Sequence, residues 1–426
     1  MDSPKHLEII FLGDELLLGI RSNGHLVYLG DRLTRHGLPI QRTQEIRDEE
    51  DDIRTAFLSA WERSDIVITT GGLGPTTDDL TRETIAASLG RDLVFNEAQG
   101  KELHEFFALR GREVTPNNLR QCYVVDGAER LKNSNGTAPG QWLEIDGKLL
   151  IMLPGPAHEL KPMFEEQVLP RLINRGLALE RPAYLQLRTI GVGESYLQTR
   201  LEPIFNRHAG QISTAYCAHN GLVDLRLRPI GGRVEWSQLQ DIGEECAELL
   251  GDGFLGYGTP EVEDWILRKL RSLNSRLAVA ESCTGGLLAS RFTDVPGASQ
   301  VFAGGIVCYQ NEVKEALLGV PGCLLEQHGA VSAECAVAMA TGVAERLEAD
   351  YAVAITGFAG PEGGNGEPPG TIYIGYHSPV GVWSCKLIHP GQRQAVKQRA
   401  VNSSLDFIYR KLKKYAAYDL LECLRC

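Results

Sequence analysis

The strongest constraint on the fold is the repeated order of strand, glycine loop and helix along residues 6–170. The segment "RSDIVITTGGLG" (63–74) predicts a buried strand that runs into a glycine loop. The next segment, "TTDDLTRETIAASLG" (76–90), predicts a helix that opens with hydroxyl and acidic side chains and ends at Gly90. Parallel strands need such crossovers between them. The repeat therefore predicts a parallel sheet covered by helices.

The middle of the chain follows a different pattern. Within residues 171–257, "LVDLRLRPIGG" alternates like a half-exposed strand and "WSQLQDIGEECAELLGD" has helical spacing. From residue 258 strands and helices alternate again, and a long amphipathic helix closes the chain. A chain of 426 residues is too long for a single hydrophobic core. We therefore expect two three-layer α/β domains with parallel-rich sheets at 1–170 and 258–426, joined by a small α+β domain at 171–257.

Composition excludes several classes of function. The 43 basic and 55 acidic residues give a net charge of −12, which disfavours a polyanion as the main partner. No run reaches the roughly 18 apolar residues of a membrane span, and acidic residues interrupt the apolar N-terminal stretch, unlike a secretory signal. We therefore expect a cytoplasmic protein without a membrane partner. Cys423 and Cys426 form a C-x-x-C, but no second pair or histidine stands beside it in the sequence to complete a zinc site.

Ser282 stands between a predicted strand and a predicted helix in "AVAESCTGGLLASRF" (278–292). Backbone N–H groups at a helix start favour an oxyanion or a phosphate, and a serine on such a turn exposes its hydroxyl, as in a nucleophile elbow. Gly285 and Gly286 leave the backbone open to a ligand. Ser282 alone is more simply a helix N-cap. Cys283 is a rival nucleophile, because a helix N-terminus lowers the pKa of a thiol.

A serine hydroxyl needs a base before it can attack an amide. The segment "GGIVCYQNEVKEALLG" (304–319) offers Tyr309 and Lys314. Taken alone, Lys314 is most simply a solvated helix lysine, and Tyr309 is an ordinary core or interface aromatic. A lysine acts as a base only where burial or nearby positive charge favours its neutral form. His328 has no evident acid partner, so a Ser–Lys pair is favoured over a Ser–His–Asp triad. Thr356 and Gly357 end a predicted strand, where open α/β sheets bind ligands.

Five segments, taken in order, resemble the CinA C-terminal family: "AESCTGGLLASRFTDVPGAS", "FAGGIVCYQNEVKEALLGV", "HGAVSAECAVAMA", "DYAVAITGFAGPEGG" and "PPGTIYIG". The resemblance implies deamidation of nicotinamide mononucleotide through an acyl-enzyme, without a metal or cofactor. It implies Ser282 as nucleophile, Lys314 as base and Tyr309 as an assisting group. The implied substrate-binding residues are Cys283, Thr284, Gly285, Gly286, Gly305, Thr356, Gly357 and Gly360. Gln310 and Val313 depart from the residues that the family often shows, which bears on the shape of the pocket and not on the chemistry.

A second set of motifs lies in the first 170 residues: "GDELLLG", "SNGHLVYLGDRL", "TTGGLGPTTDDLTRETIA", "NSNGTAPG" and "IMLPGPAHELKPMF". Asp78 and Asp79 follow the glycine loop, where tandem carboxylates suit either a divalent cation beside a phosphate or a helix cap. The motifs are similar to the molybdopterin-binding-like domain at the CinA N-terminus. This implies metal-assisted ADP-ribose pyrophosphatase activity with Mg, Mn or Co, and site residues Asn23, Asp48, Gly71, Gly72, Gly74, Asp78, Asp79, Asn135, Gly136 and Pro154, the tandem aspartates holding the metal. Thr77 stands where relatives often carry a further acidic ligand.

Residues 171–257 resemble the KH-type insert of full-length CinA proteins. A KH module grips nucleic-acid backbone through G-x-x-G, whereas this chain has "GVGE", with Glu194 where a phosphate would approach. We therefore expect a spacer or dimerisation element and no nucleic-acid binding. The resemblance implies a homodimer whose partners are small nucleotides, nicotinamide mononucleotide and ADP-ribose. The alternative function is a non-catalytic nucleotide- or pterin-binding protein tied to competence or DNA-damage responses.

Overall fold

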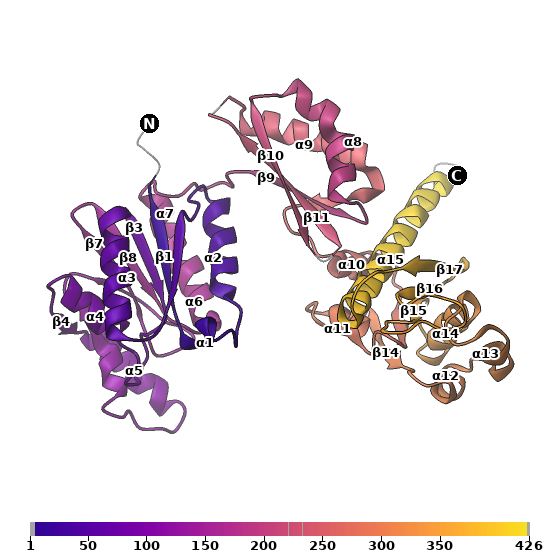
Figure 1. Ribbon diagram of the computed structural model, residues 1–426, viewed down its shortest axis with the longest axis horizontal. Helices are drawn as coiled ribbons and strands as arrows, with labels where there is room; N and C mark the ends of the chain where they lie inside the picture. The colour runs from indigo at the N-terminus through magenta and orange to yellow at the C-terminus, as the bar shows by residue number, and fades with distance from the viewer. Residues whose placement is uncertain (1–4, 220, 232, 424–426) are drawn as a thin grey trace. The chain divides into compact units, whose positions relative to one another are not determined.

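The chain forms two compact units, Met1–Ala183 and Tyr184–Cys426 (Figure 1). The computed structural model describes residues 5–219, 221–231 and 233–423, with side chains of the last helix as far as Lys414. Among the helices of these residues, none has both the length and the apolar character of a membrane span. The cysteine pair at the C-terminus, with Cys426 and the Cys423 side chain, lies outside the described part.

The first unit is built on a six-stranded sheet in the order β2-β1-β3-β8-β7-β6. The strands β2, β1, β3 and β8 are parallel neighbours, and β7 and β6 continue the sheet antiparallel. β1 and β3 are buried along their whole length, as expected for central strands covered on both faces. The bounds are β1 (Leu7–Leu12), β2 (Arg42–Ile46), β3 (Ile66–Thr70), β6 (Glu129–Leu131), β7 (Gly140–Ile145) and β8 (Lys148–Leu153).

Helices cover both faces of this sheet. Ile9 and Phe11 of β1 pack with one set of helices, while Ile10 and Leu12 pack with the other. The first set comprises α2 (Gly24–Arg35), α6 (Ala157–Met163) and α7 (Leu169–Asn174), and the second α3 (Glu50–Arg63) and α4 (Thr81–Ser88). Figure 1 shows the sheet between α2 and α3. The remaining elements are α1 (Asp14–Leu17), α5 (Glu97–Ala108), and the ribbon of β4 (Leu93–Phe95) with β5 (Tyr123–Val125).

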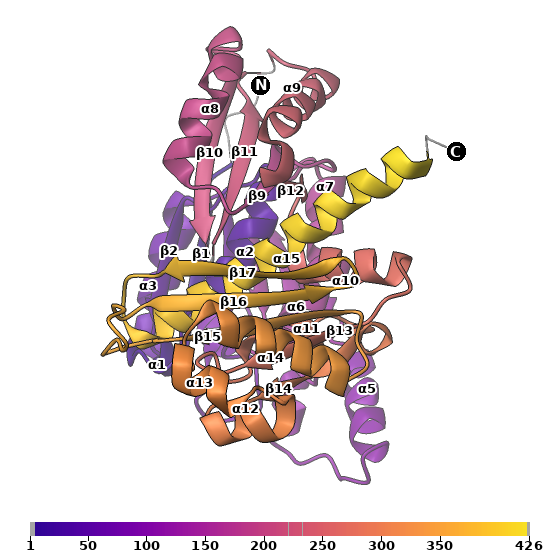
Figure 2. The same cartoon turned by 90° about the vertical axis from the view of Figure 1, so that its right-hand side faces the viewer.

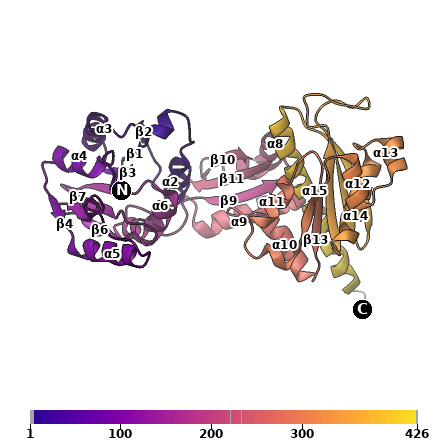
Figure 3. The same cartoon turned by 90° about the horizontal axis from the view of Figure 1, so that it is seen from below.

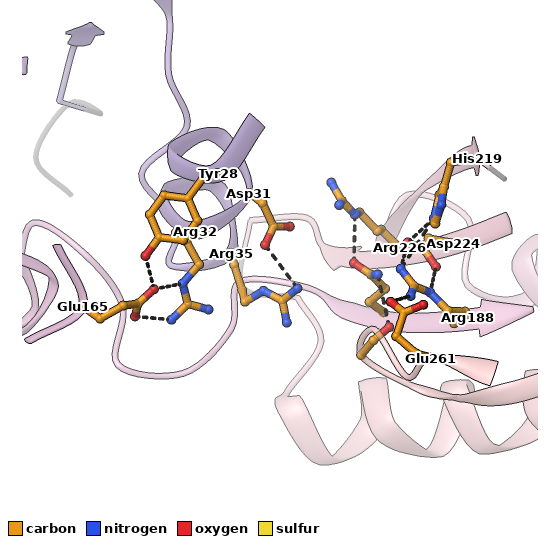
Figure 4. Close-up of polar contacts among 12 residues, drawn as sticks. Tyr28, Asp31, Arg32, Arg35, Glu165, Arg188, His219, Asp224, Arg226 and Glu261 are labelled. Carbon is orange, nitrogen blue, oxygen red and sulfur yellow. Dashed lines mark hydrogen bonds and ion pairs between the residues drawn. The ribbon is translucent and has the colours of Figure 1, made fainter. Parts of the chain in front are cut away.

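A charged cluster fastens α2 to the segment that follows α6. Arg32 donates to both carboxylate oxygens of Glu165 at 2.6 Å, and the Tyr28 hydroxyl donates to the same carboxylate at 2.6 Å (Figure 4). Arg32 and its hydrogen bonds hold the pKa of Glu165 below its usual value despite partial burial. This bidentate contact fixes the covering helix over the first face of the sheet.

The second unit begins with a four-stranded antiparallel sheet in the order β10-β11-β9-β12. Apolar side chains of this sheet share a core with α8 and α9, and Figure 2 shows these helices next to β10 and β11. The bounds are β9 (Leu185–Ile190), β10 (Ile212–His219), β11 (Leu222–Pro229), β12 (Phe254–Tyr257), α8 (Glu194–Arg207) and α9 (Trp236–Leu250). The alternating segment 222–232 is therefore a strand over most of its length, as predicted.

The rest of the second unit is a five-stranded sheet in the order β14-β13-β15-β16-β17 with helices on both faces (Figure 3). Alanines 278, 280, 352 and 354 face α12, α13 and α14, whereas larger residues such as Val279 and Ile355 face α10, α11 and α15. The strands are β13 (Leu277–Glu281), β14 (Phe302–Val307), β15 (Tyr351–Gly357), β16 (Thr371–Ser378) and β17 (Gly381–Ile388). The helices are α10 (Val262–Ser272), α11 (Leu287–Thr293), α12 (Asn311–Leu318), α13 (Gly322–His328), α14 (Ala333–Arg346) and α15 (Arg393–Cys423).

The α/β class and the three-layer arrangement are as predicted, but the sheets are more mixed. The five-stranded sheet has parallel pairs only around β13, and its pairs with β16 are antiparallel. The compact units divide after Ala183. The four-stranded sheet falls on the residues expected for the small domain, yet its Ile190, Leu222 and Leu255 share a core with α10 and α15. The division into three domains stays a prediction.

The helix predicted from Thr76 begins only at Thr81. The Asp79 carboxylate accepts from the Thr76 backbone N–H at 2.9 Å and from its hydroxyl, which holds 76–79 as a turn. Such local side-chain hydrogen bonds compete with helix formation. Asp78 and Asp79 therefore precede the helix instead of opening it.

Candidate active site

Ser282 lies on the turn after β13, at the carboxyl end of a strand with parallel neighbours on both sides. Its backbone N–H donates to the Ile355 carbonyl of β15 at 2.9 Å. The carbonyl of the preceding Glu281 accepts from the Cys308 N–H, just beyond β14, at 2.8 Å. The two neighbouring strands thus hold the turn from both sides, and Ser282 is only 8% exposed.

Lys314 of α12 brings its amine to the serine. It is 1% exposed, and its Nζ lies 3.3 Å from Ser282 Oγ. The same Nζ donates to the carbonyls of Cys308 at 2.9 Å and Tyr309 at 3.2 Å. The amine therefore has three oxygen neighbours within 3.3 Å, two backbone carbonyls and the Ser282 hydroxyl. The predicted Ser–Lys pair is therefore brought together in a geometry that suits proton transfer.

Glu281 occupies the helix start that the sequence analysis assigned to a ligand. Its carboxylate is 1% exposed and accepts from the N–H groups of Gly286 at 3.0 Å, Leu288 at 3.1 Å and Ala289 at 2.8 Å. These amides are not free to bind an oxyanion. In the described part of the chain, the N–H groups of Cys283 and Thr284 donate no hydrogen bond, so they are among the amides that a ligand oxygen can use.

Cys283 does not have the lowered pKa expected of a rival nucleophile. Burial raises the pKa of its thiol to about 12, and the Glu281 carboxylate acts in the same direction, opposing Arg393 and Lys397. Burial also raises the pKa of the nearby Cys308 thiol to about 11. Because the thiolate is the reactive form, this turn favours the serine.

The start of α15 supplies two cations that the sequence analysis did not single out. Arg393 donates to the Tyr309 hydroxyl at 2.9 Å and to the Gly360 carbonyl at 2.9 Å. Lys397 Nζ lies 3.8 Å from the position that a Cβ on Gly285 would occupy. The basic segment "GQRQAVK" was the available signal, but Arg393 is 84 residues from Tyr309. Tyr309 thus turns its hydroxyl to Arg393 and meets Lys314 through its backbone carbonyl.

The other predicted substrate-binding residues have identifiable local roles. A Cβ on Gly305 would lie 2.8 Å from Val279 Cγ2, and one on Gly357 would lie 2.4 Å from Ile372 Cδ1, so strand packing explains both glycines. The Thr356 hydroxyl donates to the Ala330 carbonyl at 2.6 Å. The Thr284 hydroxyl is buried with no hydrogen-bond partner among the described residues, beside the serine. Gly286, at φ 99°, caps α11 in a conformation that favours glycine.

His328 does have an acidic neighbour. It ends α13, and its Nδ1 lies 3.6 Å from a Glu334 carboxylate oxygen. Both side chains are partly exposed, and Ser282 instead contacts Lys314. A Ser–His–Asp triad is therefore not formed around His328.

In the first unit, the predicted site residues gather at the carboxyl ends of parallel strands. Asp48 follows β2, Gly71 follows β3, and Pro154 follows β8; the Gly71 N–H donates to the Leu153 carbonyl at 3.0 Å. Burial raises the pKa of Asp48 to about 6, and the charges of Asp14, Glu15 and Asp79 add to this shift. Asp14 and Glu15 were not predicted as site residues; they follow β1, and their charges act on Asp48.

In the glycine loop, neighbouring side chains fill the space next to the glycines. A Cβ on Gly72 would lie 2.0 Å from Thr81 Oγ1, and one on Gly74 would lie 2.4 Å from an Asp79 carboxylate oxygen. A hydrogen bond from Thr76 lowers the pKa of the exposed Asp78. Among the described residues, no group of three or more His, Cys, Asp and Glu side chains is placed to hold a metal ion. The metal-binding role of Asp78 and Asp79 stays a prediction.

The asparagines predicted for this site make local contacts. Asn23 caps α2 by accepting from the Leu26 N–H at 2.9 Å, and it donates to Glu45 at 2.8 Å. Asn135 donates to the His158 carbonyl at 2.9 Å. A Cβ on Gly136 would lie 2.2 Å from Glu159 Cδ, so this glycine makes room for a partly buried carboxylate. These contacts position the loop that faces the strand ends.

Fold and site together define a protein of two α/β units, one with a buried serine–lysine pair and one with an acidic glycine-loop site. Comparison with known proteins shows the family. Residues 8–174 match the profile of the probable molybdopterin binding domain, and residues 260–412 match that of the CinA C-terminal domain. A relative from Caldanaerobacter subterraneus subsp. tengcongensis, provisionally named a competence-damage inducible protein, is 40% identical over 408 residues, 95% of this chain and 98% of the relative. The chain belongs to the CinA family.

One further relative matches nearly the full length of this chain, and one solved structure matches part of it. A CinA-like protein of Dictyoglomus thermophilum is 38% identical over 95% of this chain and 98% of its own length. The crystal structure of a competence-damaged protein (CinA) superfamily member from Escherichia coli is 34% identical and covers 35% of this chain and 87% of that chain, with a TM-score of 0.34.

Proposed function

We propose that the site around Ser282 and Lys314 hydrolyses the carboxamide of nicotinamide mononucleotide, giving nicotinate mononucleotide and ammonia. The observation that carries this proposal is the contact between Lys314 Nζ and Ser282 Oγ, with two backbone carbonyls on the same amine. The substrate class comes from the family resemblance.

In the first step, Ser282 Oγ forms a bond to the carboxamide carbon while Lys314 Nζ takes the hydroxyl proton. The N–H groups of Cys283 and Thr284 stabilise the oxyanion that develops. Lys314 then passes its proton to the amide nitrogen, the C–N bond breaks, and ammonia leaves. An ester between Ser282 and the nicotinoyl group remains.

In the second step, water replaces Ser282 as the nucleophile, and the serine becomes the leaving group. A water molecule attacks the ester carbon as Lys314 takes one of its protons, and the bond to Ser282 Oγ breaks as the serine recovers that proton. One water is consumed and one ammonia released per turnover. At the other end of the substrate, Arg393 and Lys397 bind the phosphate, because both cations border the serine turn.

Ammonia release from nicotinamide mononucleotide by the full-length chain tests this mechanism. Ser282→Ala and Lys314→Ala are expected to lower the rate by about 10²-fold or more, whereas the exposed control changes Ser290→Ala and Lys101→Ala leave it unchanged. Activity that survives both site changes would remove the mechanism. No activity in the unchanged chain would favour the non-catalytic binding function.

For the first unit we propose hydrolysis of ADP-ribose at the carboxyl ends of β2, β1, β3 and β8. The specific support is Asp48, because burial and neighbouring carboxylates raise its pKa to about 6, and such perturbed groups cluster at functional sites. Mg²⁺ is often held by one or two carboxylates and by substrate phosphates, so Asp48 is the residue that would hold such an ion. Phosphate release coupled to phosphatase, measured with and without Mg²⁺, is expected to fall in Asp48→Asn and persist in Asp126→Asn.

A further inference from the structure

The second unit contains a groove that the proposed reaction does not use. It encloses about 650 Å³ and lies between the β9–α8 loop, the end of β10 and the first turns of α15. Its floor is apolar, with Val192, Leu222 and Ala395 among the lining residues. This volume is in the range of small-molecule sites.

The polar side of the groove is rich in unused hydrogen-bond donors. Arg399 donates one guanidinium N–H to the Pro390 carbonyl, and its other N–H groups make no hydrogen bond within the described residues. Asn402 accepts from Arg291 at 3.2 Å through Oδ1, so its amide N–H groups have no partner among the described residues. The Gln398 amide likewise makes no hydrogen bond in the described part of the chain. A surface with this excess of donors suits a ligand that carries an oxyanion.

Two histidines complete the rim. His219 Nε2 lies 3.0 Å from Asp224, a buried carboxylate that also receives two hydrogen bonds from Arg188 (Figure 4). His389 Nε2 lies 3.2 Å from Ser403 Oγ. Among the described lining residues, Glu194 is the one carboxylate, and it is exposed. The balance of charge on the groove is therefore positive or neutral.

α15 connects this groove to the candidate active site. Gln398, Arg399 and Asn402 face the groove, whereas Arg393 and Lys397 of the same first turns border the Ser282 turn. Asn402 is also bonded to Arg291 of α11, the helix that begins just after that turn. A ligand that orders the groove side of α15 would therefore also restrict Arg393 and Lys397, which border the Ser282 turn.

We propose that this groove is a second ligand site, which takes a small organic oxyanion with an apolar body and orders α15 and α11 on binding. The anion is a carboxylate or a phosphate monoester, both of which offer the acceptor oxygens that Arg399 and Asn402 can bind. Binding does not depend on the deamidase activity proposed for Ser282.

Titration calorimetry of the full-length chain with nicotinate and, separately, with adenosine 5′-monophosphate distinguishes the two anions. Asn402→Asp keeps the oxygen that binds Arg291 and replaces the free amide with a negative charge. This change and Arg399→Ala are expected to weaken binding of the recognised probe by about tenfold to a hundredfold. Arg268→Ala, an exposed arginine change on α10, and Arg393→Ala are expected to leave this binding event in place.

Hydrogen exchange tests the coupling without any enzyme assay. The bound probe is expected to slow exchange of amides in α11 and at the start of α15 in the unchanged chain but not in Asn402→Asp. Gln398→Glu provides a second variant that adds a negative charge to the groove if Asn402→Asp fails to fold. Absence of binding by both probes, or binding insensitive to the groove variants, overturns the site, and unchanged exchange on binding overturns the coupling.

Discussion

Lys314 Nζ lies 3.3 Å from Ser282 Oγ, although the two residues are 32 positions apart in the chain. The lysine is buried, and its other two partners are backbone carbonyls. An amine held in this way is part of the local structure as well as a candidate base. Changes at this position should therefore affect stability and activity together.

Lys314→Met keeps an unbranched side chain of similar length but removes the amine. Ammonia release is expected to fall by about 10²- to 10⁴-fold. The carbonyls of Cys308 and Tyr309 lose their donor, so thermal unfolding is expected to show a stability loss of about 1–3 kcal/mol. The exposed change Lys101→Met serves as the control. Full activity with a large loss of stability would mean that Lys314 is only structural.

Glu281→Gln tests the carboxylate that caps α11. The glutamine amide group replaces one of the two acceptor oxygens and points a donor at backbone N–H groups. We expect a stability loss of about 1–3 kcal/mol, together with a lower rate because the Ser282 turn is held less firmly. Glu334→Gln changes an exposed glutamate in the first turn of α14 and is expected to change stability by less than about 0.5 kcal/mol. Equal effects of the two substitutions would contradict the capping role.

Cys283 should be inert to alkylation at neutral pH. With a pKa of about 12, its thiolate fraction at pH 7.5 is below about 10⁻⁴. Iodoacetamide is expected to modify the exposed Cys323 first, as peptide mass spectrometry can show. Cys283→Ala is expected to keep ammonia release within a few-fold of the unchanged rate. A complete loss of activity in a folded Cys283→Ala chain would restore the thiol as nucleophile.

Arg393→Ala removes the cation that contacts Tyr309 and is proposed to bind the substrate phosphate. The KM for nicotinamide mononucleotide is expected to rise about tenfold to a hundredfold, because a charged hydrogen bond is lost. The value of kcat should change much less, since Arg393 does not contact Ser282 or Lys314 in the described hydrogen bonds. Arg268→Ala is the matched control. A fall in kcat with KM unchanged would place Arg393 outside phosphate binding.

Asp48→Asn tests the raised pKa of the first unit. Because the folded pKa of about 6 lies above the ordinary value of 3.8, ionisation destabilises the folded state. The contribution of protonated Asp48 to the free energy of unfolding is fully present below about pH 4 and is lost as the pH rises through about 6. Asp48→Asn is therefore expected to stabilise the chain by about 2 kcal/mol at pH 7 and by little at pH 4. Urea unfolding at both pH values measures this, with the exposed Asp126→Asn as control. An equal effect at both pH values would argue against ionisation as the cause.

Local sequence patterns predicted the elements that deliver the candidate site. The buried strand before Ser282, the helix that carries Lys314 and the glycine turns after β3 were all readable, because apolar periodicity and turn residues act over a few positions. The start of α4 was not predicted, since the Asp79 carboxylate accepts hydrogen bonds from the Thr76 backbone N–H and hydroxyl, and these bonds hold the preceding residues in a turn.

What the sequence by itself determined is the alternation of strands and helices and the residue types at the strand ends. Tertiary structure alone decided that Glu281 takes the amides of α11, that Arg393 reaches Tyr309 across 84 residues, and that burial among carboxylates shifts Asp48. The physical reason is that periodicity depends on neighbours along the chain. Hydrogen-bond partners, burial and electrostatic fields depend instead on which distant segments the packed core brings together.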